Sequence, residues 1–320
     1  MFDIDGKSLS TIMNASGCRS RYLEQLAQLV ASGMKTIITK TCTLHANSGN
    51  AEPNFRELTD NISINCLGMP NEGFHYYRDL LPRYYKQGIT YIISMDASNW
   101  DELRIMLLEY DEYVYKMKYN LGIDNNIREL VEINVSCPNK LDILTGTTSS
   151  KKIIAYDPCE LSRLLENIKT LELVNINIGL KLSPYVDKIL LEQIAQVLIT
   201  YSSIVKYIVC GNSIPNGMIM NLNTGEPLLS VKTGGISGTA NRLLGVSNVY
   251  HFNKIFNSHE KNIPIIIIGC GGIETANDIK EYFIAGSKCV QIGRVLYIDG
   301  VERLVNIRNE LNAGKIISKL

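Results

Sequence analysis

The chain of 320 residues has no excess of charge of either sign, because 32 Lys and Arg are matched by 32 Asp and Glu. Nucleic-acid-binding proteins usually carry a basic excess, so we expect no nucleic-acid partner. Long apolar runs are also lacking: the longest, IPIIIIG, has the length of a strand, whereas a bilayer span needs roughly 20 residues. The N-terminal MFDIDGKSLS does not resemble a signal peptide. We therefore expect a cytoplasmic protein without a membrane partner.

Metal-binding patterns are lacking too. No two of the eight cysteines form a C-x-x-C pair, and the four histidines do not have the spacing of metal ligands. We expect no zinc or iron–sulfur site. Scattered cysteines in a chain of this length are typical of small buried apolar residues in a reducing compartment.

Apolar segments of strand length alternate with segments that carry Leu and Ile at helical spacing. The expected strands are 11–16, 35–41, 91–97, 131–137, 176–183, 206–213, 264–270 and 288–294. The expected helices are 22–32, 76–87 (weakened by Pro82), 99–119, 161–171, 190–203, 248–258, 275–286 and 301–311. Eight such repeats favour a (β/α)8 TIM barrel as a single domain, 1–320, over a doubly wound open sheet.

Two segments do not fit the repeat. Residues 42–73 and 214–240 follow the second and sixth strands and are rich in Gly, Pro and Asn. A third long loop follows the fourth strand. Loops after barrel strands lie on the C-terminal face, where barrel active sites form.

Glycines end the seventh and eighth strands, in GCGG (269–272) and GR (293–294). Their backbone N–H groups and the following helix N-termini can bind an anion, and barrels commonly bind a phosphate at these two turns. The alternative is that the glycines only make tight turns. The two turns together predict a phosphate site.

Lys40 and Lys181 lie at the ends of apolar strands. A buried ammonium is costly unless it is paired, so the alternative is a surface lysine at a frayed strand end. The functional interpretation is a pair of cations that converge on an electron-rich ring.

Cys137 follows the fourth strand in VEINVSCPNK, between Asn134 and Asn139. A cysteine in such a place is usually inert. No histidine lies in the motif, which argues against a Cys–His nucleophile. The setting suits a thiolate that accepts a proton.

Together these stretches resemble the class 1A dihydroorotate dehydrogenases, which are soluble, contain FMN and reduce fumarate. The similarity runs nearly from end to end and keeps the family's order. It rests on MNASG (13–17), ITKT (38–41), INCLGMPNEGF (64–74), INVSCPN (133–139), GLKLSPY (179–185), GNSIPNG (211–217), GGISG (234–238), GCGGIET (269–275) and QIGR (291–294).

The resemblance implies a role for each matching residue. Cys137 would be the base that takes a proton from carbon 5 of dihydroorotate, while a hydride from carbon 6 passes to FMN. The substrate would contact Lys40, Asn65, Leu67, Gly68, Met69, Asn134, Asn139, Asn212 and Ser213. The cofactor would contact Ala15, Ser16, Gly17, Lys40, Thr41, Asn134, Lys181, Gly234, Gly235, Gly271, Gly272, Gly293 and Arg294. Fumarate as oxidant and a homodimer are further implications.

Departures from the family pattern concern the loop after Asn139, which is long, and Arg294, where a threonine is more usual. Arg294 could pair with the phosphate or point to solvent. Three alternatives remain: a class 1B enzyme linked to NAD, a tRNA dihydrouridine synthase, and a silent flavin-binding protein. The class 2 enzymes use a serine base, and the synthase would need a basic surface that this composition lacks.

Overall fold

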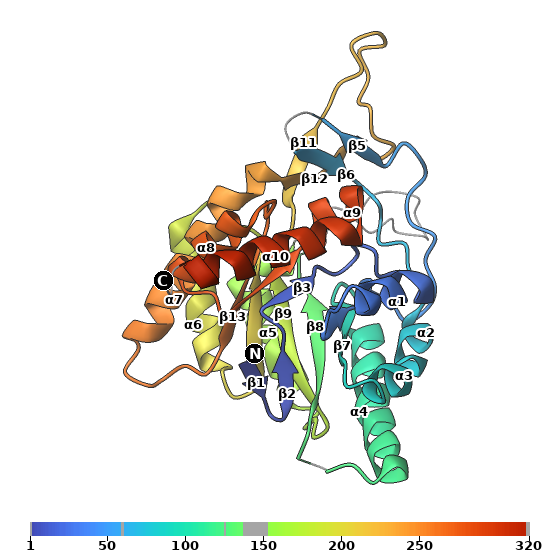
Figure 1. Cartoon of the computed structure of the whole chain (residues 1–320), viewed down its shortest axis with the longest axis vertical. Helices are drawn as coiled ribbons and strands as arrows, with labels where there is room; N and C mark the ends of the chain where they lie inside the picture. Colours follow the sequence, from blue (N-terminus) through green and yellow to red (C-terminus); the bar gives the residue numbers. More distant parts are fainter. Residues whose placement is uncertain (1, 59–60, 125, 137–152, 318–320) are drawn as a thin grey trace.

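The computed structural model describes residues 2–58, 61–124, 126–136 and 153–317. All eight predicted strands are present and form one parallel eight-stranded sheet, in the order β3-β14-β13-β10-β9-β8-β7-β4. The strands are β3 (Ile12–Asn14), β4 (Thr36–Ile38), β7 (Thr90–Asp96), β8 (Glu129–Asn134), β9 (Ile176–Leu182), β10 (Val205–Cys210), β13 (Ile266–Cys270) and β14 (Cys289–Ile292). The sheet curls into a nearly closed barrel, which confirms the predicted fold class (Figure 1).

The two ends of the sheet, β3 and β4, are joined by a side chain. The Asn14 amide Nδ2 donates to the carbonyl of Ile38 at 2.7 Å, and the Ile38 N–H donates to Asn14 Oδ1 at 2.9 Å. The Asn14 amide thus bonds as a neighbouring backbone peptide would. Since Asn14 is fully buried, no water can replace these two bonds.

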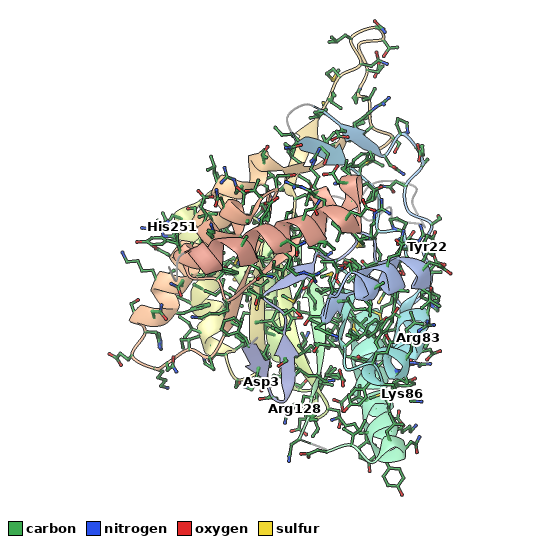
Figure 2. The ribbon with its side chains drawn as sticks, viewed as in Figure 1. Asp3, Tyr22, Arg83, Lys86, Arg128 and His251 are labelled. Atoms are coloured by element: carbon green, nitrogen blue, oxygen red, sulfur yellow. The ribbon has the colours of Figure 1, made fainter. Side chains whose placement is uncertain are left out.

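Helices surround the barrel: α1 (Leu23–Ala31), α2 (Phe74–Asp79), α3 (Leu81–Tyr85), α4 (Trp100–Leu121), α5 (Pro158–Lys169), α6 (Lys188–Thr200), α7 (Arg242–Ser258), α8 (Ala276–Ala285), α9 (Arg294–Asp299) and α10 (Val301–Ile317). The segment weakened by Pro82 is split into α2 and α3, with Pro82 in the first turn of α3. Charged side chains such as Asp3, Arg83 and Lys86 lie on the outside (Figure 2). Among the described helices, none is both long and apolar enough to cross a membrane.

The N-terminal hairpin of β1 (Phe2–Ile4) and β2 (Lys7–Leu9) was not predicted, because three-residue strands leave little periodicity to recognise. It lies beside the N-terminal ends of the barrel strands. The Ser8 carbonyl accepts hydrogen bonds from the hydroxyls of Thr36 and Thr90, at 3.3 and 2.8 Å. The hairpin therefore ties β4 and β7 together at the end of the barrel opposite the long loops.

The two turn-rich segments pair with each other. β5 (Phe55–Glu57) and β6 (Ile62–Asn65) come from the first segment, and β11 (Ile214–Met218) and β12 (Thr233–Gly238) from the second. They form an antiparallel sheet in the order β11-β12-β6-β5, which lies at the top of Figure 1, above the C-terminal strand ends. Asn65 pairs with Gly235 in the register of β6 and β12. The predicted long loop after the fourth strand falls outside the described residues.

We expect replacement of Asn14 by Leu to weaken the barrel at the β3–β4 seam. The variant leaves the N–H and C=O of Ile38 without these partners, and each buried unsatisfied group costs about 1–3 kcal/mol. Denaturant unfolding should show a loss of roughly 2–4 kcal/mol in the free energy of unfolding. The control is Asn257→Leu, on an exposed turn of α7, for which we expect little change. Equal stability of the two variants would contradict the role of Asn14.

Candidate active site

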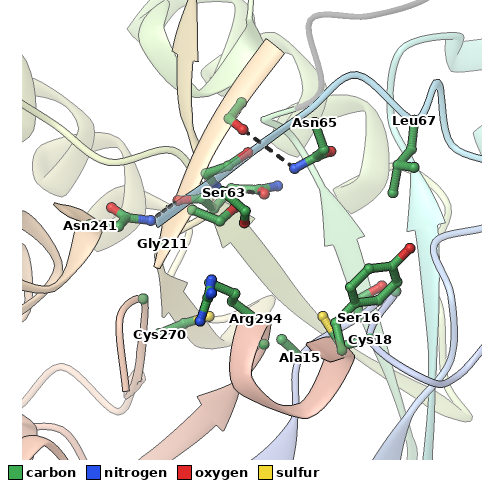
Figure 3. A pocket seen from close by; sticks show the side chains of 18 of the residues that line it. Ala15, Ser16, Cys18, Ser63, Asn65, Leu67, Gly211, Asn241, Cys270 and Arg294 are labelled. Atoms are coloured by element: carbon green, nitrogen blue, oxygen red, sulfur yellow. Dashed lines mark hydrogen bonds between the residues drawn. The ribbon is translucent and has the colours of Figure 1, made fainter. Parts of the chain in front are cut away.

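A cavity of about 230 Å³ lies between the C-terminal ends of the barrel strands and the four-stranded sheet. Residues far apart in the sequence face each other across it. Figure 3 shows Ser63, Asn65 and Asn241 on one side, and Ala15, Cys270 and Arg294 on the other. The carboxyl ends of barrel strands are where barrel enzymes assemble their active sites.

Most of the predicted site residues line this cavity. They are Ala15, Ser16, Gly17, Lys40, Thr41, Asn65, Leu67, Gly68, Met69, Asn134, Lys181, Asn212, Ser213, Gly235, Gly271, Gly272, Gly293 and Arg294. Gly234 does not line it but allows β12 and β6 to approach closely, since a Cβ there would lie 2.5 Å from the Asn65 carbonyl oxygen. Cys137 and Asn139 fall outside the described residues.

Uncharged amides and hydroxyls from β8 and the turn after β10 form one wall. Asn212 Nδ2 lies 3.0 Å from Ser136 Oγ and 3.3 Å from Asn134 Oδ1, and Ser136 Oγ donates to Asn134 Oδ1 at 3.0 Å. The backbone carbonyl of Asn212 accepts from Asn241 Nδ2 at 2.7 Å. These bonds fix the orientation of the amides, so the wall offers donors and acceptors in set directions to a planar polar ligand.

Lys40, at the end of β4, reaches the cavity beside the turn that follows β3. Gly17 in that turn has a φ of 93°, and a Cβ there would lie 3.3 Å from Lys40 Nζ. A larger residue at this position would both strain the backbone and crowd the ammonium. The glycine of the MNASG motif therefore leaves room for Lys40.

Lys181, on β9, reaches the cavity from the barrel interior. Its Nζ donates to Gln291 Oε1 at 2.6 Å and lies 3.3 Å from Cys270 Sγ. Burial is the largest influence on the pKa of Lys181 and lowers it. The nearby Cys270, Glu132 and Cys18 act in the opposite direction, and the pKa is raised overall. Lys181 therefore stays an ammonium at neutral pH, although its exposed fraction is only 5%.

Arg294 does not point to solvent, so that alternative is wrong. Its side chain is 4% exposed, and its guanidinium pairs with Glu57 of β5 and with Glu274 Oε1, the latter at 3.5 Å. Burial raises the pKa of Glu274, while Arg294 opposes the rise. Arg294 Nε is buried without a hydrogen-bond partner in the described structure. Arg294 thus connects the small sheet to the glycine turns at the ends of β13 and β14.

The sequence analysis missed several lining residues. Cys18, Phe55, Ser63, Ser136, Gly211, Pro215, Ser237, Gly238, Asn241, Cys270, Ile273, Glu274 and Tyr297 also border the cavity. Some of them, such as Gly238, lie within recognised motifs. Phe55 and Tyr297 form an aromatic pair with ring centroids 5.2 Å apart, from β5 and α9, and no local pattern could have brought these two together.

Cys18 is a cysteine inside the cavity, and it is a poor candidate for a base. Burial and the neighbouring Cys270 raise its pKa to about 11, although Lys181 and Lys40 oppose the rise. At neutral pH this side chain stays a thiol. Its presence in the cavity therefore does not make it an alternative to Cys137.

A barrel with a cavity at its strand ends that is lined by amides, two lysines and a glycine-rich rim is typical of an enzyme site. The family profile for dihydroorotate dehydrogenase matches residues 4–314. The chain belongs to the dihydroorotate dehydrogenase family, and is thus an oxidoreductase that acts on CH–CH groups.

Two relatives illustrate the similarity. A protein of Streptococcus pneumoniae serotype 4, named "Probable dihydroorotate dehydrogenase A (fumarate)", is 31% identical over 304 residues, which cover 94% of this chain and 88% of the relative. A protein of Streptococcus pyogenes serotype M18 whose name also describes a dihydroorotate dehydrogenase A (fumarate) is 31% identical over 309 residues, with the same coverage. The resemblance to the fumarate-type family is confirmed.

We expect the cavity cysteine Cys18 to resist alkylation. With a pKa of about 11, about one thiol in a thousand is ionised at pH 8. Iodoacetamide at pH 8, followed by peptide mass mapping, should label the exposed Cys159 at least tenfold faster than Cys18. Raising the pH to 10 should narrow the difference. Labelling of Cys18 as fast as Cys159 at pH 8 would show that the cavity activates it.

Proposed function

We propose that the protein oxidises dihydroorotate to orotate, with FMN as cofactor and fumarate as the electron acceptor. The observation that carries the proposal is the convergence of Lys40, Lys181 and the amide wall of Asn134 and Asn212 on one cavity. The acceptor is inferred from the names of the relatives, which specify fumarate. We also expect the assembled enzyme to be a homodimer.

The residues around the cavity fit FMN. Gly271 and Gly272 line it with φ values of 123° and 60°, in a turn that brings backbone close to a ligand. The buried Nε of Arg294 and Oδ1 of Asn241 have no partner in the described structure, and both residues border the cavity. A ligand with a phosphate and hydroxyl groups suits such a rim. Gly235, Gly293 and Arg294 would hold the phosphate end.

The ring of the cofactor would lie over Ala15, Ser16, Gly17 and Thr41, with Lys181 at one edge. When bound, FMN supplies the acceptor for the hydride that leaves carbon 6 of the substrate. The ammonium groups of Lys181 and Lys40 would stabilise negative charge that develops on the ring system during reaction. Asn134 and Lys40 would contact both cofactor and substrate.

The substrate would bind between Lys40 and the amide wall. Asn65, Asn212 and Ser213 would hold its ring and carboxylate, together with Asn139, Leu67, Gly68 and Met69. Neutral amides suit a ring that carries both donors and acceptors. Cys137 would take the proton from carbon 5, since an activated C–H bond needs a nearby acceptor and a thiolate can act without a charged partner.

An anaerobic titration tests the proposed function. The purified protein should be yellow, should bleach when dihydroorotate is added, and should regain its colour with fumarate. Bleaching without recovery would keep the first half-reaction and reject fumarate in favour of NAD or a quinone. A yellow protein that does not bleach would reject the substrate. A protein that stays colourless after FMN is supplied would reject the cofactor.

Turnover with dihydroorotate should rise between pH 6 and pH 9. An ordinary thiol, with a pKa of about 8.5, is a few per cent ionised at neutral pH, so the active fraction grows as the pH increases. The variant Cys137→Ala should bind flavin normally and lose most of the turnover. Cys159→Ala, which removes an exposed cysteine, is the control and should keep the wild-type profile. A flat pH profile, or full turnover in Cys137→Ala, would reject a thiolate base.

A further inference from the structure

Three polar side chains form a chain of hydrogen bonds across the barrel interior, below the cavity. Lys181 Nζ on β9 donates to Gln291 Oε1 on β14 at 2.6 Å, and Gln291 Nε2 donates to Glu132 Oε2 on β8 at 2.5 Å. Their exposed fractions are 5%, 1% and 0%. Burying polar groups costs free energy of folding, so these hydrogen-bonded side chains are expected to have a function.

The carboxylate of Glu132 fixes the orientation of the Gln291 amide. An ionised carboxylate only accepts hydrogen bonds, and an ammonium only donates them. Gln291 must therefore turn its NH2 group toward Glu132 and its carbonyl toward Lys181. The opposite orientation would place an NH2 group against the ammonium, so Glu132 determines that Lys181 finds an acceptor.

The amide also keeps the carboxylate away from the ammonium. The same barrel contains a direct buried ion pair for comparison: Glu129, on the same strand as Glu132, contacts Lys7 Nζ at 2.6 Å. A direct pair cancels the field of the ammonium at close range. In the chain through Gln291, Glu132 compensates the buried charge of Lys181 across one neutral group, and Lys181 still borders the cavity.

We propose that Glu132 and Gln291 are positioning residues that hold Lys181 as an uncancelled cation facing the cavity, where it favours a ligand ring that gains negative charge. The inference rests on the proposed function, because the ring in question is that of the flavin. Glu132 and Gln291 would thus influence the reduction potential of the flavin, although they border neither cofactor nor substrate.

Glu132 and Lys181 each favour the charged form of the other. Burial raises the pKa of Glu132, while Lys181 and the hydrogen bond from Gln291 oppose the rise. The pKa of Lys181 is raised overall, with Glu132 among the causes. Lys181 is the charged neighbour that favours the ionised form of Glu132, so each charge depends on the other although they do not touch.

An exchange of the two side chains tests the proposal. The double variant Glu132→Gln/Gln291→Glu keeps the net charge and allows both hydrogen bonds to form, with the amide at 132 now donating to the carboxylate at 291. It moves the carboxylate into direct contact with Lys181. The equilibrium constant for reduction of the bound flavin should fall at least tenfold. For a two-electron couple this lowers the potential by about 30 mV. Equilibration of the holoenzyme with a reference dye measures the potential.

Two further variants complete the test. Glu129→Gln, which removes a buried carboxylate from the other end of β8, should leave the potential unchanged. If the double variant does not fold, Gln291→Met replaces one neutral residue by another and removes both the acceptor for Lys181 and the donor to Glu132, so the potential should still fall. Bound flavin with an unchanged potential in the double variant, or in Gln291→Met, would overturn the proposal. A wild-type protein that binds no flavin would instead reject the proposed function.

Discussion

The closure of a parallel sheet on itself is the constraint on which the rest of the structure depends. An open parallel sheet would leave the edges of β3 and β4 unpaired, and in this chain the amide of Asn14 completes the hydrogen bonding between them. Closure brings the carboxyl ends of all eight strands into one ring. Gln291 on β14, which lies 110 and 159 positions from Lys181 on β9 and Glu132 on β8, can then meet both in the interior.

The antiparallel sheet above the barrel covers the cavity and contributes residues to it. Two loops from separate strands supply two strands each, and their pairing places Asn65 beside Gly235. Neither loop could form this sheet alone, since an isolated two-stranded hairpin is only marginally stable in water. Arg294, next to the turn that ends β14, connects the small sheet to the barrel through its ion pair with Glu57.

The way in which buried charges are paired inside the barrel changes with their distance from the cavity. At one end, Lys7 and Glu129 neutralise each other directly. Nearer the cavity, Glu132 and Lys181 are separated by Gln291, which preserves the field of the ammonium. The cavity wall itself carries the neutral amides of Asn134 and Asn212. The cavity therefore combines the charged side chains of Lys40, Lys181 and Arg294 with a neutral wall that offers directional hydrogen bonds.

The sequence by itself determined the eight strands, the helices around them and the break at Pro82, because burial on both faces and helical periodicity are local properties. It also identified most of the cavity residues, some because they end strands that must converge once the barrel closes and others through the resemblance to the family. It could not supply the hairpin of β1 and β2, the pairing of the two loops, the burial of Arg294, or the chain from Glu132 through Gln291 to Lys181. Each of these depends on contacts between segments distant in sequence, and only the tertiary structure decides which partners such residues meet.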